Sequence, residues 1–194
     1  KRIPSGGGLG GGSSDAASFV KALAKLSGVS LTAELKDKIA GDVGSDVFFF
    51  LRCSCPGCAV VSGRGEIVSE IALRKDIHIV LVFSGVHSST KEAYALVDED
   101  MQKGKTADCP ELAELEAVYN RPVKEWNFTN SFTSAIIRRY PEVGEALAEI
   151  RKTGAAFADM SGSGSVVFGI FESASAAENA FRVLILRGMK CVIA

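Results

Sequence analysis

The sequence lacks the features that would point to a membrane protein or to a nucleic-acid-binding protein. No apolar run approaches the roughly 20 residues that a membrane-spanning helix needs. The 22 lysines and arginines balance 23 acidic residues and form no basic block, which argues against nucleic acid as the main partner. No signal peptide is visible, although a chain that starts with Lys1 is expected to lack its true N-terminus. We therefore expect a soluble protein with one or two small cores.

Cysteine occurs five times, but at spacings that do not suit a metal centre. Cys53, Cys55 and Cys58 share one short segment, whereas Cys109 and Cys191 are far away in the sequence. A closed zinc site needs four ligands at paired spacing. We interpret the five as reduced thiols, and a thiolate metal site at the short segment stays open as the alternative.

Glycine, by contrast, is concentrated near the start, where residues 6–12 consist of six glycines and Leu9. Glycine lets the backbone adopt positive φ and approach a ligand closely. Ser13, Ser14 or Asp15 can then cap a helix that ends at Gly28. The unpaired N–H groups at the start of a helix attract phosphate oxygens. The loop therefore predicts a phosphate cradle, and the helix behind it shows one apolar face formed by Ala16, Phe19, Val20, Leu23 and Leu26.

Other glycine-rich loops fit this segment less well. A Walker A loop ends in Gly-Lys-Ser/Thr, but here Ser13 follows the last glycine and the next lysine is Lys21. The dinucleotide fingerprint G-x-G-x-x-G is met formally, yet Pro4 stands where its strand should end. A flexible linker is disfavoured because Leu9 lies in mid-loop and an amphipathic helix follows. The segment therefore favours a phosphate cradle.

The segment Pro-x-x-x-x-Leu-Gly-Gly-Gly-Ser-Ser-Asp-Ala-Ala, which begins at Pro4, resembles the second motif of the GHMP kinase superfamily. Residues 44–47, 63–66 and 160–165 resemble further segments of that family in order and approximate spacing. The resemblance therefore spans nearly the whole chain. It is strongest to a member that phosphorylates a cytidyl diphosphate sugar alcohol in isoprenoid precursor synthesis.

This resemblance implies an ATP-dependent kinase, with Mg²⁺, that transfers the γ-phosphate to the 2-hydroxyl of that small-molecule substrate. It implies a location in the bacterial cytoplasm or a plastid, with no membrane or nucleic-acid partner. Two alternatives stay open. The first is another GHMP enzyme, such as a mevalonate-pathway kinase or diphosphomevalonate decarboxylase. The second is a truncated ATP-binding module without catalysis, because the active-site lysine of the family lies upstream of the residues present here.

The same resemblance assigns the residues that hold the nucleotide. One serine hydroxyl after the loop is expected to cap the helix and the other to bind a phosphate oxygen or Mg²⁺, with Ser14 as the candidate metal ligand. The predicted ATP-binding and phosphate-binding residues are Pro4, Ser5, Gly6, Gly7, Gly8, Leu9, Gly10, Gly11, Gly12, Ser13 and Ser14.

Asp46 is the candidate catalytic residue. Transfer of a phosphoryl group to an alcohol needs a group that accepts the hydroxyl proton, and a carboxylate at the junction of a loop and a strand can do so. The Gly-Ser-Asp-Val context matches the position of the family's catalytic aspartate, although Phe48 stands where the family has proline. Asp42, in the same predicted loop, is the competitor, and we interpret it as a turn residue.

Two further segments carry predicted roles. The resemblance places Tyr94 against the cytosine ring of the substrate, with Thr90 nearby, although a tyrosine at that place in a helix also suits a core. His78 and His87 show no spacing for a metal or a catalytic triad and are predicted to be structural.

A short glycine turn near the end of the chain is the third predicted part of the site. Gly162, Ser163 and Gly164 join two strands and match the family's third motif, which comes up to the phosphate cradle. The segment 130–133 is Asn-Ser-Phe-Thr where the family has Asn-Asp-aromatic-Glu. A role that the two acidic residues play in the family is therefore not expected here.

The order of the predicted elements indicates an α+β protein of the GHMP kinase type. Residues 1–75 are expected to be the remainder of an N-terminal domain of the S5 domain 2-like class, and residues 76–194 a complete ferredoxin-like domain with a split βαβ arrangement. Thr32 is expected to cap a short helix that stops at Gly41. The predicted strands are 47–51, 59–62, 67–71, 77–83, 155–160, 166–171 and 189–193, and the other predicted helices are 91–101, 111–119, 132–152 with breaks, and 174–186.

Overall fold

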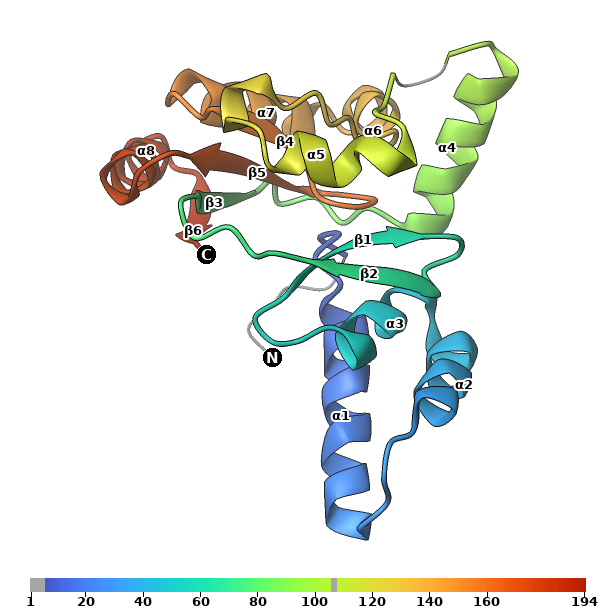
Figure 1. Ribbon diagram of the computed structural model, residues 1–194. Helices are drawn as coiled ribbons and strands as arrows, with labels where there is room; N and C mark the ends of the chain where they lie inside the picture. Colours follow the sequence, from blue (N-terminus) through green and yellow to red (C-terminus); the bar gives the residue numbers. More distant parts are fainter. Residues whose placement is uncertain (1–5, 106–107) are drawn as a thin grey trace. The chain divides into compact units, whose positions relative to one another are not determined.

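The computed structural model describes residues 6–105 and 108–194, which form two compact units (Figure 1). The smaller unit comprises residues 10–74. The larger unit comprises residues 75–194 together with the described part of the glycine loop before Gly10. The glycine loop is thus divided between the units, and each unit is described by itself below. Pro4 and Ser5 lie outside the described residues.

The smaller unit contains three helices and a hairpin. Its helices are α1 (Gly11–Ser27), α2 (Ala33–Val43) and α3 (Ser45–Arg52), and its strands are β1 (Cys58–Ser62) and β2 (Ile67–Ile71). The core lies where α3 packs against α1 and α2, with Ala17, Ala40, Val47 and Leu51 buried. Alanine at two of these four positions lets the helix backbones approach closely.

Helix α1 differs from its sequence-based description in two ways. It begins at Gly11, so the three predicted cap residues lie inside the helix, Ser13 and Ser14 in its first turn. The buried side chains are Ala17 and Ala24, whereas Phe19, Leu23 and Leu26 of the predicted packing face are 68%, 52% and 86% exposed. The face of α1 that carries small residues packs on α3. The face that carries large apolar residues is uncovered in this unit.

The predicted strand 47–51 is wrong, because this segment is helix α3. Five consecutive apolar residues carry no clear period, so sequence alone does not separate a buried strand from a short helix. The burial of Val47 and Leu51, four residues apart, shows that the helical period holds here. Gly44, at the junction, ends α2 and precedes α3. Helix α2 also runs past Gly41 to Val43, although Thr32 caps its start as predicted, at 3.3 Å from the Leu35 amide.

The β1–β2 hairpin agrees with the sequence. The strands pair antiparallel, with Cys58 opposite Ile71 and Ser62 opposite Ile67. Arg64 lies in the turn, where its amide donates to a Glu66 carboxylate oxygen at 2.6 Å. The hairpin is therefore closed by a local side-chain hydrogen bond.

The larger unit is built on a four-stranded antiparallel sheet in the order β4-β5-β3-β6. The sheet order and the crossover helices match the predicted split βαβ arrangement. Its central strands alternate apolar residues that reach the core, such as Val80 and Val82. The strands are β3 (His78–Phe83), β4 (Phe157–Met160), β5 (Val166–Phe171) and β6 (Lys190–Ile193).

Helices α7 and α8 contact the sheet, and the core between them contains Ile150, Phe171 and Leu184. The predicted helical regions are confirmed with shifted ends, and the region 132–152 divides at Tyr140, where Pro141 begins the next helix. The helical elements of this unit are α4 (Thr90–Gln102), η1 (Leu112–Glu114), α5 (Leu115–Tyr119), η2 (Val123–Glu125), α6 (Thr133–Arg139), α7 (Pro141–Lys152) and α8 (Ala174–Leu186).

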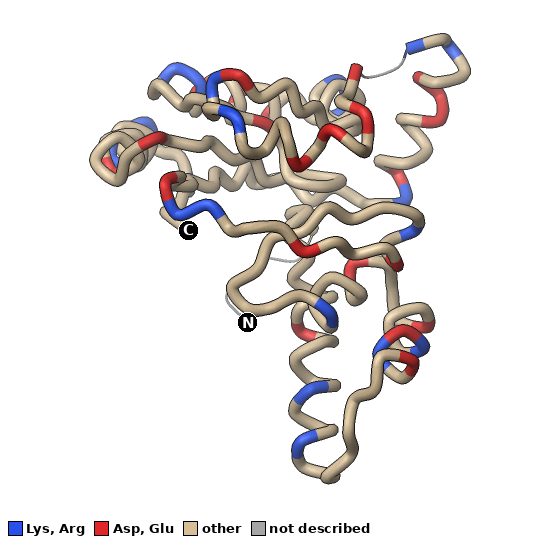
Figure 2. Tube along the Cα trace, in the orientation of Figure 1, with Lys and Arg blue, Asp and Glu red and all other residues tan. Residues whose placement is uncertain are grey.

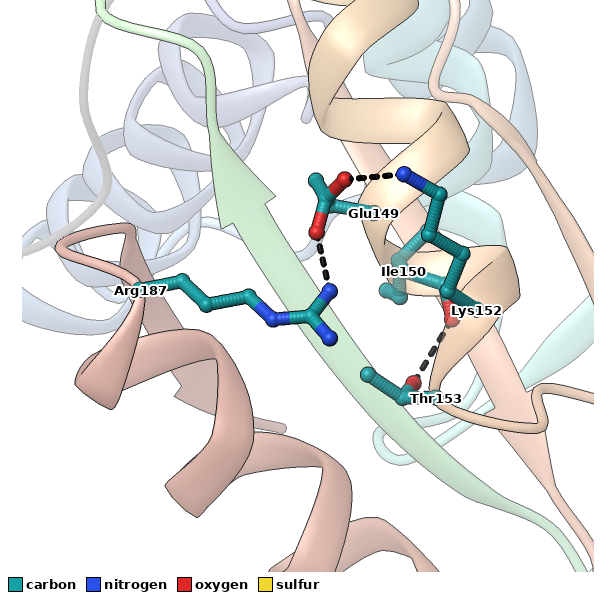
Figure 3. A network of polar contacts seen from close by, with 5 residues as sticks. All are labelled: Glu149, Ile150, Lys152, Thr153 and Arg187. Carbon is teal, nitrogen blue, oxygen red and sulfur yellow. Dashed lines mark hydrogen bonds and ion pairs between the residues drawn. The ribbon is translucent and has the colours of Figure 1, made fainter.

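Glu149 ties α7 to the end of α8 at the surface of this unit (Figure 3). Its carboxylate accepts from Lys152 Nζ at 2.6 Å and from Arg187 Nη1. The hydrogen bond from Lys152, together with that from Arg187, lowers the pKa of Glu149. Because all three side chains are partly exposed, this network contributes little to stability by charge alone.

Charges of both signs are interspersed along the trace (Figure 2), in keeping with the formal net charge of −1. Among the helices of the described residues, none is long and apolar enough to cross a membrane.

Candidate phosphate-binding and catalytic site

The first turn of α1 forms the part of the cradle that lies in the smaller unit. Gly10 precedes the helix in a left-handed conformation, with φ 62°, and its carbonyl accepts the Ser14 amide at 2.9 Å. Gly10 has no side chain with which to cap the helix. The predicted caps at Ser13, Ser14 or Asp15 are therefore wrong as caps. The N–H groups of this first turn and the positive end of the helix dipole are suited to anionic oxygens.

Asp46 lies beside this helix start. It occupies the first turn of α3, is exposed, and places Oδ2 3.9 Å from where a Cβ on Gly10 would lie. A carboxylate in a first turn is stabilised by the dipole of its own helix. Asp42, the competitor, lies in the last turn of α2 rather than in a loop. The structure therefore brings Asp46 to the start of α1.

Ser13 and Ser14 are half-buried in the first turn of α1. Among the described residues there is no group of three His, Cys, Asp or Glu side chains that could hold a metal ion. In phosphoryl-transfer sites Mg²⁺ is bound by one or two protein oxygens plus phosphate oxygens and water. A serine hydroxyl at this place is an oxygen ligand of the required kind.

The described part of the loop in the larger unit packs on the predicted glycine turn. Ser161 Oγ donates to the Gly8 carbonyl at 2.9 Å, and the Val166 amide donates to the Gly7 carbonyl at 3.2 Å. A Cβ on Gly8 would lie 1.9 Å from the Ser161 carbonyl oxygen, so only glycine permits this approach. The structure thus brings together the loop and the turn that contains Gly162, Ser163 and Gly164.

The start of α4 reaches the same turn. Thr90 Oγ1 and Ser163 Oγ are 3.1 Å apart, and the buried Ser88 donates from Oγ to the Ser163 carbonyl at 2.9 Å. The His87 ring lies against Gly6, where a Cβ would fall 2.0 Å from Nδ1. Sequence reasoning missed Ser88, whose only signal was its place just before Thr90, and it predicted a structural role for His87.

Tyr94 lies one turn further along α4. Its side chain is 57% exposed, and its ring meets Phe132 edge to face with the ring centroids 4.9 Å apart. A core position for Tyr94 is therefore wrong, and much of the ring is open to solvent.

Comparison with known proteins identifies the family of this chain. The family model described as GHMP kinases N terminal domain matches residues 1–54, and that described as GHMP kinases C terminal matches residues 111–189. The chain belongs to the GHMP kinase family. This confirms the resemblance and the α+β fold class inferred from the sequence.

Eight curated relatives of this GHMP kinase share one name. The 4-diphosphocytidyl-2-C-methyl-D-erythritol kinase of Treponema pallidum is 37% identical over 198 residues, which cover 99% of this chain and 67% of the relative. The kinase of the same name from Bacteroides thetaiotaomicron is 39% identical over 175 residues, covering 89% of this chain and 60% of the relative. The chain thus spans about two thirds of the length of the curated relatives it matches, and these relatives are phosphotransferases that act on an alcohol group.

Solved structures give the same grouping. A crystal structure of 4-(cytidine 5'-diphospho)-2C-methyl-D-erythritol kinase matches with a TM-score of 0.76 at 33% identity, over 100% of this chain and 67% of that one. A homoserine kinase from Cytophaga hutchinsonii matches with a TM-score of 0.52 at 16% identity, over 100% of this chain and 67% of that one, and shows the fold alone.

Segment 130–133, in which this GHMP kinase departs from the family pattern, makes structural hydrogen bonds. Asn130 Nδ2 donates to the carbonyls of Met160 at 2.7 Å and Gly162 at 2.8 Å. Thr133 Oγ1 and the backbone N–H of Asn130 both donate to the buried Asp159 carboxylate, at 2.6 and 3.0 Å. The segment therefore fixes the entry to the glycine turn through amide and hydroxyl groups.

The cysteine segment of this kinase lies after α3. All five cysteines are free, and Cys53 is buried while Cys55 is exposed. Burial, followed by the nearby Glu70 carboxylate, raises the pKa of the Cys53 thiol. Cys53 is therefore held as a neutral thiol at neutral pH.

Proposed function

We propose that this chain transfers the γ-phosphate of ATP to the 2-hydroxyl of 4-diphosphocytidyl-2-C-methyl-D-erythritol. Two observations support this: the shared name of relatives that match nearly its whole length, and the position of Asp46 beside the start of α1. The relatives named above are bacterial, and we place the activity in a bacterial cytoplasm.

In this proposal the first turn of α1 binds and orients the phosphate oxygens. Gly10 leaves the helix start uncapped, and the N–H groups of the turn are fixed before the ligand arrives, so binding costs little reorganisation. Mg²⁺, when held by Ser13 or Ser14 and the phosphates, neutralises charge on the transferring group. Donors that are already in place are the main contribution that a protein makes to phosphoryl transfer.

Asp46 accepts the proton of the attacking hydroxyl at its carboxylate. Because the carboxylate is exposed and lies at the helix start, it is reachable by an acceptor whose oxygen approaches the bound phosphate. General base catalysis of this kind contributes about 10²–10⁴-fold to a rate. We assign the exposed ring of Tyr94, with Thr90, to the cytosine end of the acceptor, since an aromatic face binds a flat base by stacking.

The test is a kinase assay with ATP, Mg²⁺ and three acceptors: the cytidyl substrate, mevalonate and homoserine. Because the chain spans about two thirds of its relatives, it is assayed alone and as a chimera in which it replaces the matching part of the Treponema pallidum kinase. We expect phosphorylation of the cytidyl substrate only. Activity on mevalonate or homoserine alone would overturn the proposal, and nucleotide binding without transfer to any acceptor would favour a non-catalytic module.

A further inference from the structure

Helix α3 carries Asp46 in its first turn and Arg52 in its last. The helix has only eight residues, and within the smaller unit Val47 and Leu51 are its buried side chains. Phe48 and Phe50 add partly buried packing against the same core, but apolar packing alone resists sliding and rotation of a short helix only weakly, since dispersion contacts lack direction. The exact position of the Asp46 carboxylate therefore depends on what holds the other end of α3.

Arg52 connects that end to two neighbouring elements. Its Nε donates to Asp37 Oδ1 on α2 at 2.8 Å, and Nη2 forms an ion pair with the same oxygen. Nη1 donates to the carbonyl of Glu66, at the start of the β1–β2 hairpin's second strand. The planar guanidinium uses three nitrogens at fixed angles, which defines a direction as well as a distance.

One contact with a neighbouring helix fixes the same end of α3, and one contact within α3 orients the Arg52 side chain. Lys21 on α1 donates from Nζ to the carbonyl of Phe50 at 2.7 Å. The guanidinium of Arg52 also lies over the Phe48 ring, 5.4 Å from its centroid. Lys21 holds α3 to the helix whose first turn faces Asp46, while Arg52 sets the orientation of α3 against α2 and the hairpin.

Stability alone does not account for this arrangement. The side chains of Arg52 and Asp37 are 32% and 40% exposed, and ion pairs with that much exposure contribute little to folding. A guanidinium that joins three elements contributes geometry instead. The effect of losing it is therefore expected in the alignment of Asp46 more than in the unfolding midpoint.

We propose that Arg52 is a positioning residue for the proposed phosphoryl transfer, which orients α3 and with it the Asp46 carboxylate. This rests on the proposed function. A displacement of about 1 Å at a reacting group costs on the order of 10²-fold in rate, whereas the binding of ATP by α1 does not depend on α3's orientation in the same way.

The experiment measures kcat and KM for ATP in Arg52→Ala, Arg52→Lys and the control Arg187→Ala, which removes a similarly exposed guanidinium from an ion pair in the larger unit. We expect kcat to fall by at least about 10-fold in Arg52→Ala, with KM for ATP within about twofold. Arg52→Lys, which keeps the charge but not the fork, is expected to be nearly as slow. Added guanidinium ion is expected to restore part of the rate in Arg52→Ala and to leave the rates of the other two variants unchanged.

A double-mutant cycle separates positioning from general damage. If Arg52 acts through Asp46, then Arg52→Ala has no further effect on kcat in an Asp46→Asn background. Losses that multiply would overturn the proposal, as would equal slowing in Arg187→Ala.

If the chain has no kinase activity on any acceptor, the proposed function fails. Hydrogen exchange then tests the role of Arg52 without an activity assay. We expect faster amide exchange over residues 45–52 in Arg52→Ala and unchanged exchange in α7. Unchanged exchange in α3 would overturn the positioning role independently of the assay.

Discussion

Asp46 and Asp42 lie four residues apart, yet the structure gives them different surroundings. Asp46 stands in the first turn of α3, where the helix dipole stabilises a carboxylate, and faces the start of α1. Asp42 stands near the end of α2, where the dipole opposes a negative charge, and is exposed. Local geometry thus supports the choice of Asp46 that the family pattern suggested.

Asp46→Asn is expected to separate catalysis from binding. The amide keeps the size of the carboxylate but cannot accept the hydroxyl proton, so kcat is expected to drop by at least about 10²-fold while ATP still binds. Asp42→Asn is the matched control and is expected to change kcat little. Equal losses in the two variants, or an unchanged rate in Asp46→Asn, would show that positioning and the metal carry the reaction without this base. Rates come from the acceptor assay, and binding from calorimetric titration with ATP.

At the scale of elements, the agreement with sequence-based expectation depends on whether a segment has a clear period. The β1–β2 hairpin and the strands and helices from His78 to Ile193 were predictable, because alternating or helical apolar patterns are separated there by glycine and polar residues. Helix α3 was not, since its all-apolar run fits either period. The exposed Phe19 and Leu26 on α1 were also misjudged, because periodicity shows that a face is apolar but not that something covers it.

The candidate site shows the same division. The glycine loop, Asp46 and the glycine turn were found from motifs, which depend on neighbouring residues in the sequence. Ser88 and Arg52 were not, because their partners lie 75 and 15 residues away respectively and only the fold brings them together. Contacts of this kind leave no local pattern.

Two glycines on α1 offer a matched test of the phosphate cradle. Gly10 and Gly28 flank the helix with nearly the same backbone, φ 62° and 67°, but a Cβ on Gly10 would meet the Phe50 ring at 3.1 Å whereas one on Gly28 meets nothing within 4 Å. Valine at either position is strained by roughly 1–2 kcal/mol. We expect Gly10→Val to lose ATP affinity and Gly28→Val to keep it, with a larger loss of stability in Gly10→Val because its side chain also meets the Phe50 ring.

Calorimetric titration of ATP into both variants, with circular dichroism to confirm that the fold is retained, makes the comparison. Unchanged affinity in Gly10→Val, or equal losses in both variants, would show that the start of α1 does not bind the nucleotide.

For the whole molecule, the carboxylates whose pKa shifts are resolved predict how stability changes with acid. Glu92, Asp100 and Glu149 in the larger unit each have a lowered pKa, the first through a hydrogen bond from Tyr140, the second from Arg138 and the third from Lys152. Glu66 and Glu70 in the smaller unit are lowered through backbone amides. A carboxylate whose pKa is lower in the folded state stabilises the fold fully at a pH above its unfolded-state pKa. This stabilisation is lost as the pH falls through its folded-state pKa. Both units are therefore expected to lose stability as the pH drops below about 4.5.

Asp100 gives the sharpest form of this expectation. It is buried to 7% exposure, and Arg138 Nη2 donates to its Oδ2 at 2.7 Å, joining α4 to α6. Because its folded pKa lies below the ordinary value of 3.8, its contribution is complete at neutral pH and disappears only below about pH 4. Asp100→Asn is thus expected to lower the urea midpoint at pH 7 and to approach the parent protein as the pH falls below about 4, because the parent's stabilisation by its ionised carboxylate is lost progressively there. Exposed Asp98 on the same helix is the control, and Asp98→Asn is expected to follow the parent at every pH. A difference between Asp100→Asn and the parent that stays constant from pH 7 to pH 3 would mean that the loss comes from packing, because only an ionised partner of Arg138 produces a pH-dependent gap.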